Sequence, residues 1–224
     1  MHIAEGFLPP VQAAAWFAVS APFVIHGARA VIAESRRTPE NTLLLAVAGA
    51  FTFVPRRLLP SVTGSSSHPT GTGVGAILFG PPVMAFLGTV VLVFQALLLA
   101  HGGLTTLGAN VFALAIAGPW AGYGAWRLAR SIRLPRAVGI FAAMAVADLT
   151  TYVVSSAQLA LAHPDVGSGV VGSLAKFLGI FALTQVPLAV AEGILGVLLF
   201  RFLDQVARPH LVRLGLAAEE PVHA

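Results

Sequence analysis

Charged residues are scarce in this chain: Asp, Glu, Lys and Arg together make up 10% of its 224 residues. Soluble domains carry about 25%, so this sequence has too little charge to cover a water-facing surface. A hydrophobic share of 57% and a mean hydropathy of +0.85 point the same way. These values predict an integral membrane protein, and they argue against soluble enzymes, disordered chains and nucleic-acid-binding proteins.

Cysteine is absent, which excludes disulfides, thiolate metal sites and cysteine nucleophiles. Walker A, G-x-G-x-x-G and H-E-x-x-H motifs are absent as well. The length suits one membrane domain and leaves no room for a soluble ATPase domain. The net charge of +4 comes mainly from arginines in short polar gaps between apolar runs. Such placement is typical of charges that set membrane topology, and no nucleic-acid partner is expected.

The N-terminus lacks the features of a secretory signal peptide, because its first basic residue, Arg29, follows the first apolar run. The bulky His2 should discourage removal of the initiator methionine. We therefore expect a mature chain that begins at Met1, on the external side of the membrane.

Apolar runs of about 20 residues are long enough to cross a bilayer. The sequence predicts helices at about 11–33, 42–59, 108–126, 137–160 and 174–200, with a further run over 74–100 that is interrupted at Gly80-Pro81-Pro82.

The arginines of 34–41 and 127–136 can both lie inside only if the chain passes twice between residues 63 and 100. The first of these passes is short, and it must begin as buried irregular backbone in the Gly/Ser/Thr-rich stretch 63–75. Arg56 and Arg57 are exceptions, since they fall near the outer face. The predicted fold class is therefore an all-α, polytopic membrane helical bundle of about seven transmembrane segments, N-out and C-in.

Two histidines can carry metal chemistry. The amine of Met1, the peptide nitrogen of His2 and the imidazole of His2 can chelate one ion in two fused rings. The imidazole of His68, within the stretch 61–73, could take the fourth position. Four nitrogens in a plane suit Ni(II) or Cu(II) and are compatible with Co(II). In the alternative interpretation, His2 is a solvated terminal residue and His68 an ordinary loop histidine.

Other polar residues are candidates for supporting roles. Ser67, His101 and Asn110 are expected beside the metal ligands or along the way in, although His101 could simply cap a helix. Asp148 and Glu192 are ionisable groups within predicted spans, where charge is rare and often functional. They could serve an ion-coupled carrier, but isolated carboxyls among small residues are more often interhelical hydrogen-bond anchors.

Five segments resemble the CbiM family, the substrate-capture subunits of cobalt transporters of the energy-coupling-factor type. They are Met1–Leu8 (MHIAEGFL), Pro60–Gly75 (PSVTGSSSHPTGTGVG), Phe94–Phe112 (FQALLLAHGGLTTLGANVF), Ala147–Pro164 and Phe181–Gly193 (FALTQVPLAVAEG). The resemblance extends over nearly the whole chain to about residue 200. This chain departs from the family pattern at Ala4, Ser66 and Pro55-Arg56-Arg57, none of which is a proposed ligand.

The resemblance implies a seven-helix protein that binds its metal through the N-terminal amine, His2 and His68. The implied substrate is Co(2+), which would be used for cobalamin synthesis; the chemistry of the proposed ligands leaves Ni(2+) as an alternative substrate. The implied partners, besides membrane lipid, are a transmembrane coupling subunit, a small accessory membrane subunit and a pair of cytoplasmic ATPases. Residues 1–200 would be the metal-capture domain in the cell membrane, and 201–224 a polar cytoplasmic tail.

Three other functions remain open from sequence. A square-planar site that includes an amide nitrogen favours nickel uptake. The amino-acid sequence of the 61–75 loop instead favours cobalt. An autonomous ion-coupled carrier would use Asp148 and Glu192. An intramembrane enzyme is disfavoured, because no catalytic constellation is present. No cofactor is expected beyond the transported ion.

Overall fold

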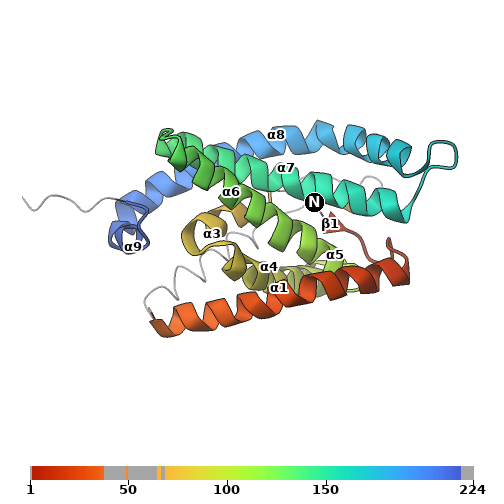
Figure 1. The fold of residues 1–224 in the computed structure, drawn as a ribbon, viewed down its shortest axis with the longest axis horizontal. Helices are drawn as coiled ribbons and strands as arrows, with labels where there is room; N and C mark the ends of the chain where they lie inside the picture. Colours follow the sequence, from red (N-terminus) through yellow and green to blue (C-terminus); the bar gives the residue numbers. More distant parts are fainter. Residues whose placement is uncertain (1, 38–48, 50–64, 67–68, 218–224) are drawn as a thin grey trace, which may run out of the picture.

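The computed structural model describes residues 2–37, 49, 65–66 and 69–217 (Figure 1). The helices are α1 (Pro10–Arg37), α3 (Thr72–Phe79), α4 (Pro81–Leu99), α5 (Leu107–Asn110), the π-helix η1 (Val111–Ala117), α6 (Gly118–Ser131), α7 (Arg136–Ala162), α8 (Gly169–Val206) and α9 (Arg208–Arg213), and the strands are β1 (His2–Ile3) and β2 (Ser65–Ser66). The predicted all-α fold class is confirmed. The helix predicted at 42–59 lies, apart from Gly49, outside the described residues.

Four of these helices, α1, α4, α7 and α8, are long and apolar enough to cross a membrane. The chain is therefore a multi-pass membrane protein. Helices α5, η1 and α6 follow one another without a break over 107–131, as the run predicted at 108–126 requires.

The predicted interruption at Gly80-Pro81-Pro82 is confirmed. Gly80 separates α3 from α4 at φ +83°, in a region that glycine adopts without steric penalty. Helix α3 has eight residues and is too short to cross alone. Its buried position in protein is what a short, re-entrant segment needs.

Helices α6, α7 and α8 form one packed group, and α1 and α4 form another (Figure 1). Helix α7 lies between α8 and α6, and α1 packs against α4. Small residues allow the close approach of α6 and α7: a Cβ added at Gly118 would lie 2.6 Å from Thr151 Oγ1. Such small-residue contacts are typical of helix packing in membranes.

The C-terminal part stays attached to the bundle. Helix α8 runs through residue 200 to Val206, and the buried Leu211 of α9 belongs to the same apolar cluster as Met144 and Phe200. The boundary predicted at residue 200 thus falls inside a helix, and the cytoplasmic position of 201–224 stays a prediction. Helix α9 lies at the opposite end of the molecule from the loop that joins α7 to α8 (Figure 1).

Candidate metal centre

The start of the chain is built into the bundle as a strand. β1 pairs antiparallel with β2, with His2 opposite Ser66 and Ile3 opposite Ser65. The His2 side chain is 1% exposed and Ile3 is fully buried. The alternative in which His2 is a solvated terminal residue is therefore wrong.

The amide of Asn110 satisfies the backbone of β1 on the side away from β2. The Ile3 N–H donates to Asn110 Oδ1 at 2.8 Å, and Asn110 Nδ2 donates to the Ile3 carbonyl at 3.0 Å. Thr106 Oγ1 also donates to that carbonyl, at 2.9 Å. The side chain of Asn110 thus occupies the place of a third strand, which fixes the residue next to His2.

His101 covers the imidazole of His2. The two ring centroids are 4.4 Å apart and the rings are tilted by 59°. His101 follows the C-terminus of α4, where its N–H donates to the Gln95 carbonyl at 3.1 Å. Of the three residues expected to support the site, His101 and Asn110 therefore do adjoin β1.

The loop before α5 also encloses the chain after β1. Thr105 N–H lies 3.2 Å from Glu5 Oε1, and Gly6 N–H donates to Thr105 Oγ1 at 3.1 Å. Hydrogen bonds from Thr105 lower the pKa of the Glu5 carboxyl below its ordinary value. Gly103 leaves no room for a side chain, since an added Cβ would lie 2.5 Å from Glu5 Cα.

A carboxylate from α8 holds the chain that follows His68. Glu192, which is buried, accepts hydrogen bonds from Thr70 N–H (2.8 Å), Thr70 Oγ1 (2.8 Å) and Gly71 N–H (2.7 Å). Glu192 is thus a hydrogen-bond anchor, as its surroundings predict, but it anchors a loop rather than a second helix. Asp148 on α7 is equally buried, and neither of its oxygens has a hydrogen-bond partner among the described residues.

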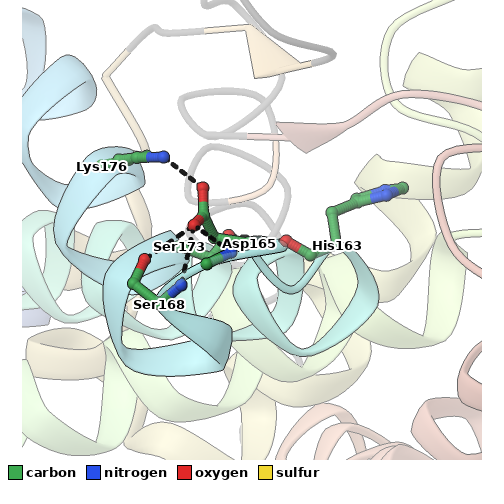
Figure 2. Close-up of polar contacts among 6 residues, drawn as sticks. His163, Asp165, Ser168, Ser173 and Lys176 are labelled. Carbon is green, nitrogen blue, oxygen red and sulfur yellow. Dashed lines mark hydrogen bonds and ion pairs between the residues drawn. The ribbon is translucent and has the colours of Figure 1, made fainter.

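The loop between α7 and α8 is held by polar contacts with the start of α8 (Figure 2). Lys176 forms an ion pair with Asp165, and Ser168 donates to the same carboxylate from Oγ at 2.8 Å. These contacts hold the pKa of Asp165 well below its ordinary value. His163, in this ordered loop, donates from Nε2 to the carbonyl of Phe7 at 2.8 Å. Sequence reasoning assigned His163 no role at the site.

Three of the predicted site residues, Met1, Ser67 and His68, lie outside the described residues. Within the described part of the chain, no group of three or more His, Asp or Glu side chains could hold a metal ion. What the structure does bring together is a buried histidine at position 2, a strand pairing with the chain before His68, and a clamp on the chain after it.

Comparison with known proteins agrees with this architecture. The family model described as “Cobalt uptake substrate-specific transmembrane region” (CbiM) matches residues 2–211. The cobalt transport protein CbiM of Propionibacterium freudenreichii subsp. shermanii is 66% identical over 96% of this chain and 92% of its own. That of Streptomyces coelicolor is 64% identical over 96% and 94%.

Two solved structures share the fold. One, titled as a truncated transition metal transporter, has a TM-score of 0.72 at 25% identity and covers 92% of this chain and 99% of its own. Another, titled as a transition metal transporter, has a TM-score of 0.73 at 24% identity and covers 97% of this chain and 100% of its own.

Proposed function

The chain belongs to the CbiM family of cobalt uptake substrate-specific transmembrane regions, and we propose that it captures Co(2+) through the N-terminal amine, His2 and His68. It is a membrane component of cobalt uptake and a transport subunit rather than an enzyme. The proposed ligands are the amine of Met1, the peptide nitrogen and imidazole of His2, and the imidazole of His68.

The observation that carries the proposal is the antiparallel pairing of Ser66 with His2, a residue that is itself buried. Ser66 precedes His68 by two residues, so chain geometry limits the separation of their Cα atoms to about 7 Å. On the other side of His68, the chain continues through Pro69 to Thr70, whose N–H donates to Glu192. Both proposed imidazoles therefore belong to chain segments that meet at β1 and β2.

This set of ligands restricts which metal ions can bind. The peptide nitrogen must lose its proton, which requires a strongly polarising ion such as Co(II), Ni(II) or Cu(II). Metal ligands bind in their deprotonated forms, and a buried site protects them from competing water. A square of nitrogens suits nickel at least as well as cobalt, so nickel uptake is the second candidate.

The proposed partners follow from the family and from the lack of a nucleotide-binding motif in this chain. A transmembrane coupling subunit, a small accessory subunit and a pair of cytoplasmic ATPases would supply the energy for release. The imported metal would feed cobalamin synthesis. An autonomous carrier built on Asp148 and Glu192 has less support, because Glu192 already accepts three hydrogen bonds.

The position of a tag tests the proposed ligands. Adding two residues before Met1 converts the ligating amine into an amide and removes His2 from the second position. We expect the N-terminally extended protein to lose its bound metal after expression with equal Co and Ni. A tag of equal size after Ala224 should leave about one ion per chain, measured by elemental analysis.

Membrane insertion and thermal unfolding of the metal-free forms serve as controls, since no helix is altered. Equal metal content in the two tagged proteins would contradict the amine and His2 site. Nickel in place of cobalt in the C-terminally tagged protein would support the same ligands with the second substrate.

A further inference from the structure

A cavity of about 260 Å³ lies where α6 ends and α7 begins. The turn between the two helices and the chain just after α9 line it. The residues that shape it are Trp126, Arg130, Leu134, Arg136, Gly139 and Leu216. Because β1 lies near the other end of α7, this cavity is separate from the candidate metal centre (Figure 1).

The guanidinium group of Arg136 is only partly satisfied. Its Nη1 donates to both oxygens of Asp204, at 3.0 and 2.7 Å. Its Nε and Nη2 are buried and have no hydrogen-bond partner among the described residues. Buried donors of this kind are rarely left unpaired, and a guanidinium prefers an anion with several oxygens, such as a phosphate or a carboxylate.

Two further features favour an anion in this cavity. Arg130 brings a second guanidinium, which lies over the ring of Trp126 with 5.7 Å between its Cζ and the ring centroid. Helix α7 begins at Arg136, and its N-cap residue Pro135 offers no side-chain hydrogen bond. The first N–H groups of this 27-residue helix are therefore open to an acceptor.

Exposed apolar side chains also lie beside the cavity. Leu128, Ile132 and Leu134, beside or in the turn, are 62%, 60% and 43% exposed in this chain. Exposed apolar side chains at the end of a membrane-spanning helix are typical of a surface that contacts lipid. Basic pockets in this position between membrane helices bind lipid headgroups.

We propose that this cavity binds the headgroup phosphate of an anionic phospholipid. The phosphate accepts from Arg136, Arg130 and the N-terminus of α7, and the start of the lipid chains lies along the apolar residues of the turn. The lipid would then join α6, α7 and the chain after α9 at the membrane surface.

The test uses the full chain, tagged at the C-terminus and purified in detergent. Apparent affinity is measured by native mass spectrometry with phosphatidylglycerol, and with phosphatidylcholine of the same chain length. The variant is Arg130→Gln, because Arg130 is exposed and its loss should not impair folding. The matched control is Arg127→Gln, which makes the same charge change on an exposed residue of α6 outside the cavity.

We expect Arg130→Gln to weaken phosphatidylglycerol binding about tenfold or more and Arg127→Gln to change it less than about twofold. Phosphatidylcholine should bind more weakly to the unaltered protein. Equal losses in both variants would show a general effect of surface charge and overturn the proposal. Displacement of the lipid by inorganic phosphate at the same concentration would also overturn it in favour of a soluble anion.

Discussion

At the scale of single residues, the candidate site depends on side chains that act in place of secondary structure. A two-residue strand has little stability of its own. Here the amide of Asn110 pairs with both backbone groups of Ile3, and Thr106 adds a second donor to the carbonyl. All of these groups are buried, so each lost partner leaves a polar atom that water cannot reach.

The variant Asn110→Ala tests this arrangement. It leaves the buried Ile3 N–H without a partner, at a cost of about 1–3 kcal/mol, and it removes one of the two donors to the Ile3 carbonyl, which keeps Thr106 Oγ1. We expect the affinity for cobalt to fall about tenfold or more, and the midpoint of thermal unfolding to fall as well. Both quantities are measured by calorimetry on the C-terminally tagged protein. Thr89→Ala is the control, since it removes a side-chain hydrogen bond within α4, far from β1 in sequence. Equal metal affinities in the two variants would remove Asn110 from the positioning role.

Sequence reasoning could single out His2 because a chelate with the terminal amine depends only on its position in the chain. It could also select Asn110 as a neighbour. It could not find the hydrogen bonds that join Asn110 to Ile3, because these two residues are separated by 107 positions and no sequence pattern connects them. The strand itself has two residues, too few for an alternation of polar and apolar side chains to be visible.

At the scale of elements, the long helices could be predicted and the π-helix could not. The run predicted at 137–160 is α7, Arg136–Ala162, because length and apolar content decide whether a segment can cross a bilayer. The π-helix η1, in contrast, has no signature in the sequence, and it lies among contacts from a distant part of the chain. Thr151 and Gln158, both on α7, donate to the carbonyls of Ala113 and Ala109 in or before η1.

The clamp between α8 and the loop before α3 gives a prediction at this scale. Glu192→Gln removes one carboxylate oxygen and places an amide N–H against the donors of Thr70 and Gly71. Hydrogen bonds to a charged group contribute about 1.5–3 kcal/mol each. We expect lower thermal stability and weaker cobalt binding, with no change in the ratio of bound Co to Ni.

The matched control for this clamp is Asp148→Asn, an isosteric change at a buried carboxyl that makes no hydrogen bond among the described residues. Its effect on stability and on metal content should be the smaller of the two. Metal uptake that follows an imposed proton gradient, and that either substitution abolishes, would instead favour the ion-coupled carrier.

At the scale of the whole molecule, the two sites proposed here lie at opposite ends of α7. This helix has 27 residues, which is about 40 Å of α-helix and enough to cross the bilayer. Four arginines precede or begin it, and the loop after it approaches the N-terminal segment through His163. The distribution of basic residues predicts that the arginine-rich end faces the cytoplasm and that the candidate metal centre faces outward.

Because the natural chain contains no cysteine, single cysteines can test this orientation without background labelling. Val166 is fully exposed in the loop after α7, and Ser131 is exposed at the end of α6, before α7 begins. We expect a membrane-impermeant maleimide to label Val166→Cys in intact cells, and to label Ser131→Cys only after the membrane is permeabilised. Both substitutions lie outside the helical cores, so cobalt content should be unchanged and serves as the check on folding. The reverse labelling pattern would place the N-terminus inside. The buried His2 would then receive its metal from the cytoplasm, which is incompatible with capture for uptake.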